Sequence, residues 1–289
     1  MSTPAEQLDP DRERRATDWR SDPWFTPPER VPWSQLGPDV MAVWGRADPK
    51  NPQPEHLEIV GPSGSGKTHA LCTFLQDRYR ARRTAATLIC TKPADKVIHQ
   101  LGWPITGDYD EAVRRGWSNF VYWPKTRKMG NDRKAYHEQR ISHLLNRLWQ
   151  PGANRIVAFD EIGYVEGLSG EIRALIQQYW REARSQGITV AAMKQRPQGA
   201  LRDMHSETYW TAAFAPKDRA DVERFAELFG HRRDWMPVFD GLDPDRHEFI
   251  LRHSRSREAY ITWIDTPLIP VKPKSRLPLW LRRLRGGES

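Results

Sequence analysis

The sequence predicts an α/β fold with a mostly parallel central sheet flanked by helices. Short apolar segments at 56–60, 84–90, 155–159 and 188–193 alternate with segments of helical periodicity, a pattern typical of parallel sheets covered on both faces. The first apolar segment leads into a glycine-rich turn and then a helical pattern. This strand–turn–helix order is typical of domains that bind a phosphate group at a helix N-terminus.

Residues 1–54 are expected to form an extended N-terminal arm, ahead of a domain at 55–265. The arm is rich in Pro, Trp, Asp and Arg, and prolines at this frequency interrupt helices and strands. Four tryptophans, at 19, 24, 33 and 44, indicate that the arm docks onto a surface. That surface belongs either to its own domain or to a neighbouring subunit.

The turn after the first strand matches the phosphate-binding pattern G-x-x-x-x-G-K-T. The predicted phosphate-binding residues are Gly61, Pro62, Ser63, Gly64, Ser65, Gly66, Lys67, Thr68 and His69. Glycines allow backbone N–H groups to turn inward around the phosphates, Lys67 reaches the β and γ oxygens, and the Thr68 hydroxyl completes a Mg²⁺ shell. A chance match of a Gly/Ser-rich turn is the alternative. The flanking strand and helix favour a nucleoside triphosphate site.

The remaining elements of the domain follow in order. Strands are expected at 84–90, 120–123, 155–159, 188–193 and 208–215, with helices at 132–149 and 171–186 and a hairpin within 247–265. Gly152 and Gly187 lie just beyond the two helical patterns, where glycine commonly ends a helix.

Two acids, Asp160 and Glu161, end the apolar strand at 155–159. Asp160 suits the carboxylate that holds Mg²⁺ through water, and Glu161 suits a general base that activates the attacking water. Hydrolysis of a phosphoanhydride needs this pair, whereas a kinase does not need the second acid. The alternative is that the two acids cap the N-terminus of a following helix.

Gln195 follows the strand at 188–193. An amide at this point, beside the strand that carries the acids, can reach the γ-phosphate or the attacking water. A surface glutamine in a loop is an equal alternative from position alone.

Composition favours a polyanionic partner. The net charge is +8, which suits nucleic acid or an anionic membrane surface. No run of about 18 apolar residues exists, so no membrane span is expected, and no secretory signal is visible. Cys72 and Cys90 lie in apolar stretches and are expected to be reduced core residues. A cytosolic chain is the expectation.

Two basic segments are candidates for that partner. The C-terminal tail, 266–289, carries Lys272, Lys274, Arg276, Arg282, Arg283 and Arg285 against Glu288 alone. A solvated tail, a nucleic-acid or partner-binding tail and a membrane-surface anchor all remain open. Residues 125–134 form a second basic stretch between a strand and a helix; DNA contact and a solvated loop are equal alternatives.

The stretch Thr91-Lys92-Pro93-Ala94-Asp95 is similar to the guanine-selecting motif [NT]KxD. Its aspartate comes one residue too late, and the stretch follows the second strand instead of lying late in the domain. GTP is therefore not indicated, and ATP is the expected nucleotide.

The ordered set of these motifs resembles the FtsK/HerA superfamily of hexameric DNA-pumping ATPases, which includes packaging ATPases of tailless double-stranded DNA viruses. The set comprises 61–68, the acid pair 160–161, and a helix ending in Arg184-Ser185-Gln186-Gly187 before the strand that leads to Gln195-Arg196-Pro197. Similarity continues through 210–214 and 216–221 to a helix ending at Gly230, so the resemblance covers roughly residues 55–265.

The resemblance implies a RecA-like, additional-strand (ASCE) P-loop ATPase that binds ATP and Mg²⁺. It implies a homo-oligomeric ring, a hexamer, acting on double-stranded DNA. An arginine of a neighbouring subunit then stabilises the transition state. By its place in the motif Arg219 is the candidate, with Arg202 and Arg224 as rivals. For each of them taken singly, a solvated surface arginine is the favoured interpretation.

The membrane region and separate DNA-reading domain of FtsK itself are not visible in this sequence. This departure favours a compact motor that packages a phage or prophage genome in the cytoplasm of a bacterial host, or within a virion. A capsid vertex or a membrane-associated protein is the implied docking partner. The alternatives are a conjugation or plasmid-transfer ATPase, a zonular-occludens-toxin-like phage assembly ATPase, and a nucleotide-dependent adaptor with little turnover.

Overall fold

The computed structural model describes residues 22, 25–44, 54–196 and 202–270. Its strands are β1 (Glu29–Arg30), β2 (His56–Val60), β3 (Ala85–Ile89), β4 (Ile105–Thr106), β5 (Phe120–Tyr122), β6 (Arg155–Phe159), β7 (Ile188–Lys194), β8 (Thr208–Phe214), β9 (Phe249–His253) and β10 (Ala259–Thr262). Its helices are α2 (Trp33–Val43), α3 (Lys67–Arg82), α4 (Lys96–Gln100), α5 (Tyr109–Arg115), α6 (Gly130–Leu148), α7 (Ile162–Glu166), α8 (Gly170–Glu182), α9 (Arg202–Glu207), α10 (Arg219–Phe229) and α11 (Arg232–Asp240), with a 3₁₀ turn at Ala183–Gln186.

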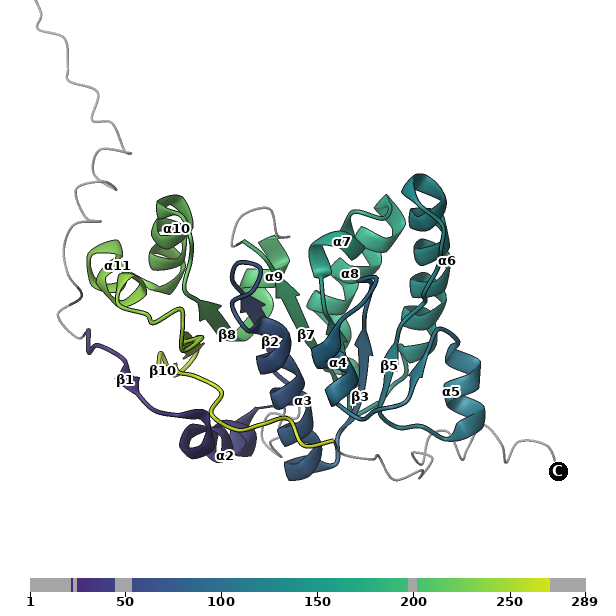
Figure 1. The fold of residues 1–289 in the computed structure, drawn as a ribbon, viewed down its shortest axis with the longest axis horizontal. Helices are drawn as coiled ribbons and strands as arrows, with labels where there is room; N and C mark the ends of the chain where they lie inside the picture. Colours follow the sequence, from purple (N-terminus) through teal and green to yellow (C-terminus); the bar gives the residue numbers. More distant parts are fainter. Residues whose placement is uncertain (1–21, 23–24, 45–53, 197–201, 271–289) are drawn as a thin grey trace, which may run out of the picture.

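All ten of these strands form one sheet in the order β1-β10-β9-β8-β2-β7-β6-β3-β5-β4 (Figure 1). The strands from β8 through β4 are mutually parallel. The hairpin β9–β10 adds antiparallel strands beside β8. The predicted mostly parallel α/β sheet and the hairpin within 247–265 are therefore confirmed. Strand β7 lies between β2 and β6, which is the additional-strand arrangement.

Helices cover both faces of the sheet. One face packs against α2, α3 and α4 around apolar side chains such as Ile59, Leu71 and Leu88. The other face packs against α5 to α8 on the β3–β7 side and against α10 and α11 on the β8–β9 side. Because both faces are covered, β2, β3, β5, β6 and β7 are buried along their whole lengths.

Part of the predicted arm is folded onto the domain. Strand β1 pairs with β10, and α2 packs against α3. Trp33 and Trp44 are buried in the core; their indole N–H groups donate to Asp77 Oδ2 (2.9 Å) and to the Glu55 carbonyl (3.1 Å). Trp19, Trp24 and residues 45–53 lie outside the described residues. The boundary at residue 54 stays a prediction.

The expectation that prolines interrupt regular structure throughout the arm is wrong for helix α2. Pro38 lies inside the helix. A proline there removes one backbone hydrogen bond, but the helix buries Leu36, Val40 and Met41 together with Trp33. Burial of several large apolar side chains contributes several kcal/mol, enough to exceed the cost of roughly 3 kcal/mol for an internal proline.

Both cysteines are buried and unbridged. In the described part of the chain no helix has the length and apolar character needed to cross a membrane.

Candidate nucleotide-binding site

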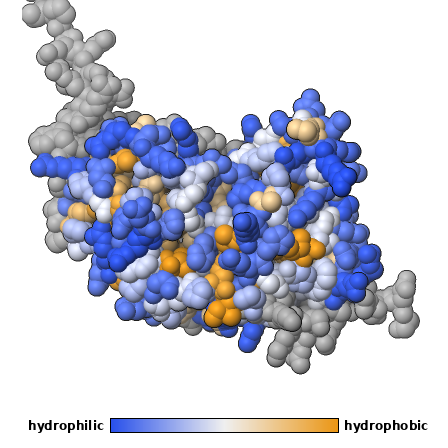
Figure 2. All heavy atoms as spheres, in the orientation of Figure 1, coloured by the Kyte–Doolittle hydropathy of each residue, from blue (hydrophilic) through white to orange (hydrophobic). Residues whose placement is uncertain are grey.

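The phosphate-binding turn joins β2 to α3 at the carboxyl edge of the parallel strands. The Gly61 N–H donates to the Lys194 carbonyl (3.2 Å), which anchors the turn to the end of β7. Gly66 has φ 96° and immediately precedes α3, a left-handed conformation that favours glycine. A Cβ at Gly61 would stand 2.5 Å from Phe214 Cβ, so this position has no room for a side chain. In the view of Figure 2 the upper edge of the molecule is hollowed between the part that carries α10 and α11 and the part that carries α6 and α7.

Lys67 is the first residue of α3 and is almost completely buried. Its Nζ donates to the Pro62 carbonyl at 2.7 Å, within the turn itself. Burial lowers the pKa of Lys67 to about 8, and the carboxylates of Glu161 and Asp160 act in the opposite direction. The charges of the lysine and the acid pair therefore interact.

Asp160 follows β6 and is 1% exposed. Its backbone N–H donates to the Ile89 carbonyl (3.0 Å), which holds it between the ends of β6 and β3. Oδ1 accepts a hydrogen bond from Lys92 Nζ at 2.9 Å, and the Cys90 thiol lies 3.7 Å from Oδ2. Burial raises the pKa of the Asp160 carboxyl, and the Lys92 ammonium opposes that rise.

Lys92 also contacts the phosphate-binding turn, because its Nζ lies 3.3 Å from Thr68 Oγ1. Thr68 and Asp160, the two predicted Mg²⁺ ligands, thus converge on one cationic nitrogen. These hard oxygen donors fit a magnesium ion, which takes few protein ligands and completes its shell with phosphate and water. No cluster of three His, Cys, Asp or Glu suited to a metal occurs in the part of the chain that the structure describes.

Glu161 stands at the N-cap position of α7, but its side chain makes no capping hydrogen bond. The carboxylate instead accepts a hydrogen bond from Gln195 Nε2 (3.0 Å). The structure therefore brings the predicted base and the predicted sensor into contact. Pro197, the last residue of the Gln-Arg-Pro motif, lies outside the described residues.

Two of the arginine candidates, Arg219 and Arg224, lie on the surface. Arg219, the first residue of α10, is exposed and pairs with Asp240 (3.0 Å) and Glu223 (3.8 Å). Arg224 pairs with Glu227 (3.3 Å). None of these three ion pairs involves the phosphate-binding turn or the acid pair. The side chain of Arg202 lies outside what the structure describes. A role for any of them in a neighbouring subunit's site stays a prediction.

Three residues of this site were not predicted from the sequence. Lys92 lies three residues beyond β3, and Lys217, whose Nζ is 3.4 Å from the Ser63 carbonyl, lies three residues beyond β8. His247 packs against Gly66, and together with burial it lowers the pKa of the predicted site residue His69. For the two lysines the available signal was position: basic residues just after parallel strands gather at one edge of the sheet.

The basic stretch 125–134 borders the site. A cavity of about 390 Å³ lies between it and the β3–α4 loop, and its lining includes Lys92, Lys125, Arg127, Arg133 and His137 and no acid. At the tip of the stretch Met129 is 83% exposed.

A buried charge cluster lies beneath Gln195. Glu58, at the centre of β2, pairs with Lys194 Nζ (2.5 Å) and His205 Nδ1 (2.9 Å). Glu166 on α7 is also buried, and burial raises the pKa of its carboxyl to about 7 against the opposing charge of Lys194. The cluster ties the phosphate-binding strand to the strand that presents Gln195.

Glu166→Gln is expected to remove part of the pH dependence of stability. The folded-state pKa of about 7 exceeds the usual value of 4.5, so the folded chain keeps this proton longer and loses stability as the pH rises from 4.5 to 7. At pH 8 the variant should gain about 1–3 kcal/mol in the free energy of unfolding. Near pH 4.5 its free energy of unfolding should differ little from that of the wild type. Urea denaturation at both pH values checks this. Glu29→Gln, on exposed β1, removes the same charge and should show no such difference; equal effects of the two substitutions would contradict the assignment.

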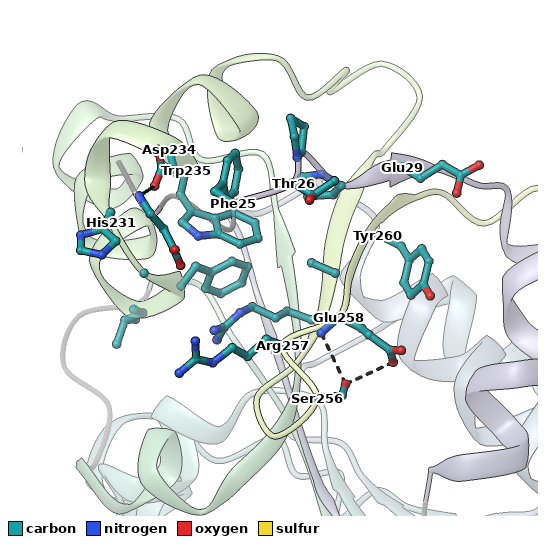
Figure 3. Close-up of a pocket in the computed structure, with 18 of the residues that line it drawn as sticks. Phe25, Thr26, Glu29, His231, Asp234, Trp235, Ser256, Arg257, Glu258 and Tyr260 are labelled. Atoms are coloured by element: carbon teal, nitrogen blue, oxygen red, sulfur yellow. Dashed lines mark hydrogen bonds between the residues drawn. The ribbon is translucent and has the colours of Figure 1, made fainter. Parts of the chain in front are cut away.

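A separate cavity of about 690 Å³ lies among α10, α11, the β9–β10 hairpin and residues 25–29 (Figure 3). Phe25 packs edge-on against Trp235, and Arg252 lies over the Trp235 and Phe229 rings. Residues of the turn and the acid pair are not part of its lining.

Comparison with solved structures identifies viral NTPases of the same fold. The genome packaging NTPase B204 from Sulfolobus turreted icosahedral virus 2, in complex with sulfate, has a TM-score of 0.53 and 12% identity, over 75% of this chain and 97% of that one. B204, the DNA-packaging ATPase from Sulfolobus turreted icosahedral virus, has a TM-score of 0.54 and 11% identity, over 75% and 98%. The B204 complex with AMPPCP has a TM-score of 0.54 and 12% identity, over 74% and 98%.

No family model matches this sequence, and no curated protein is significantly similar to it. At 11–12% identity the structural similarity establishes the fold. The predicted resemblance to packaging-type P-loop ATPases is confirmed at that level: the chain has the α/β P-loop NTPase fold.

Proposed function

We propose that this chain is an ATP-hydrolysing motor that moves double-stranded DNA, and that its use is the packaging of a phage or prophage genome. The observation that carries the proposal is the convergence of Thr68 and Asp160 on one cation position, beside a Glu161–Gln195 pair. A B204 NTPase of the same fold is described as a DNA-packaging ATPase and another as bound to AMPPCP, which supports the assignment to DNA and to ATP.

In this proposal each residue of the site has one task. The turn and Lys67 bind the β- and γ-phosphates, and Thr68 and Asp160 hold Mg²⁺, which neutralises charge that develops on the phosphates. Glu161 accepts the proton of the attacking water, and Gln195 orients that water while its hydrogen bond to Glu161 holds the carboxylate in place. Arg219 of a neighbouring subunit supplies a positive charge from outside.

DNA contact is assigned to the exposed basic stretch 125–134 and to the tail 266–289, most of which lies outside the described residues. Both would bind phosphates without reading bases. The stretch is connected to the nucleotide site, because Arg133 Nη2 donates to the Thr91 carbonyl at 2.7 Å.

The test is ATPase activity with and without DNA. Long linear duplex DNA should raise the rate several-fold more than the same mass of short duplex, because a translocating motor dissociates at the ends of short DNA. Lys125→Ala/Lys128→Ala should weaken the stimulation and flatten its salt dependence. Arg114→Ala/Arg115→Ala on α5 removes the same charge from an exposed surface elsewhere and should leave the stimulation intact. A rate that is indifferent to DNA would favour a virion-assembly or adaptor role instead.

A further inference from the structure

Lys92 is the one residue whose side chain joins the two halves of the nucleotide site, among those the structure describes. Its Nζ contacts Thr68 Oγ1 (3.3 Å), Asp160 Oδ1 (2.9 Å) and Asp95 Oδ2 (3.3 Å). Three oxygen atoms from three separate segments, the start of α3, the residue after β6 and the β3–α4 loop, therefore surround one ammonium group. A divalent cation held by Thr68 and Asp160 would need the same two oxygens.

We propose that Lys92 is an internal cation that competes with Mg²⁺ for Thr68 and Asp160. It keeps these two ligands paired until a metal–nucleotide complex displaces it. The inference rests on the proposed Mg-nucleotide site and assigns to that site a positioning residue, which sets when the metal is accepted.

Charge balance explains why a cation is needed at this point. Asp160 is almost completely buried, and a buried carboxylate without a partner costs several kcal/mol. The Cys90 thiol, at 3.7 Å, is a weak donor and supplies no charge. Lys92 supplies the positive charge that a metal ion would otherwise bring.

The surroundings of Lys92 allow its side chain to leave while its backbone stays. The Lys92 carbonyl accepts a hydrogen bond from Trp123 Nε1 (2.7 Å), and Arg133 holds the carbonyl of the preceding residue. The side chain itself is one-third exposed and borders the cavity of about 390 Å³. Asp95 remains as its partner, and Asp95 is fixed because it accepts hydrogen bonds from the N–H groups of Val97 and Ile98 in the first turn of α4. Displacement therefore needs only a rotation of the lysine side chain.

Because Trp123 precedes the basic stretch 125–134 and Arg133 belongs to it, the same lysine is placed to link metal binding with that stretch. The release of Lys92 moves one positive charge from the site into a cavity already lined by cations.

Binding of Mn²⁺ alone, measured by electron paramagnetic resonance at pH 7.5 without nucleotide, tests the proposal. Lys92→Met should bind Mn²⁺ at least about tenfold more tightly than the wild type, since the competing ammonium is gone. Lys92→Arg, which keeps the charge, should stay near the wild type. Lys96→Met, an exposed lysine one turn away, removes the same charge without touching Asp160 and should also match the wild type.

Thermal unfolding supplies a second readout. Mn²⁺ should raise the melting temperature of Lys92→Met and leave that of the wild type unchanged. Equal Mn²⁺ affinity in the wild type and Lys92→Met, or equal tightening in Lys96→Met, would overturn the proposal. Failure of both proteins to bind Mg-ATP would overturn the proposed function instead, and the metal-alone comparison would still decide the role of Lys92.

Discussion

Glu161→Gln should reduce ATP turnover by ~10²-fold or more while ATP binding is retained, because the amide keeps the size of the side chain but cannot accept a proton. The structure indicates that this variant can keep the hydrogen bond between residues 161 and 195. Gln195 Nε2 donates to Glu161 Oε2, and a glutamine at 161 can turn its carbonyl oxygen to accept the same hydrogen bond. The geometry of the pair is preserved, so a loss of ATP turnover would reflect the loss of the general base and not a change in structure. Single-turnover hydrolysis and the binding of a fluorescent ATP analogue are the two measurements.

The matched control is Gln195→Ala, which removes the donor and leaves the base. If Gln195 orients the base and the water, this variant should lose less activity than Glu161→Gln, by about 10-fold relative to the wild type. Turnover of Glu161→Gln within a factor of about three of the wild type would remove the role of general base from this residue.

Much of the fold could be predicted from the sequence because its central strands are buried on both faces. The apolar runs at β2, β3, β6 and β7 are continuous and unambiguous. The ends of these strands determine where the residues of the site lie. The short helices α4, α5 and α7 were not predicted. With five to seven residues each, they are too short to show a periodic pattern, and α4 and α5 instead begin at aspartate caps, Asp95 and Asp108.

The candidate site could be predicted where a single sequence motif specifies both the type of a residue and its position at the end of a strand. The turn at 61–68, Asp160, Glu161 and Gln195 all lie at strand ends and meet as expected, although their chemical roles stay predictions. Lys92 and Lys217 could not be found in this way. Each belongs to a loop of ordinary composition, and only the strand order β8-β2-β7-β6-β3 brings those loops to the phosphate-binding turn.

Lys67→Met should weaken ATP binding by about 10- to 100-fold, the cost of one or two lost charge-assisted hydrogen bonds to phosphate. The same change should leave the stability of the free protein unchanged or raise it. Lys67 is almost completely buried, with one hydrogen bond, to the Pro62 carbonyl, and its pKa is lowered to about 8 chiefly by burial. The protein therefore holds a cation in a place where it costs folding energy, and methionine fills the same space without that cost.

Isothermal titration calorimetry with ATP measures the change in binding, and urea denaturation of the same protein preparation measures the change in stability. Lys217→Met is the matched control, because Lys217 is exposed and meets the same turn only through the Ser63 carbonyl; it should weaken binding by less than about threefold. A loss of both binding and stability in Lys67→Met would indicate a lysine that holds the turn together. A loss of binding with stability kept identifies a lysine whose buried charge is maintained for the phosphates, since its hydrogen bond to Pro62 and the charges of Glu161 and Asp160 do not offset the cost of its burial in the free chain.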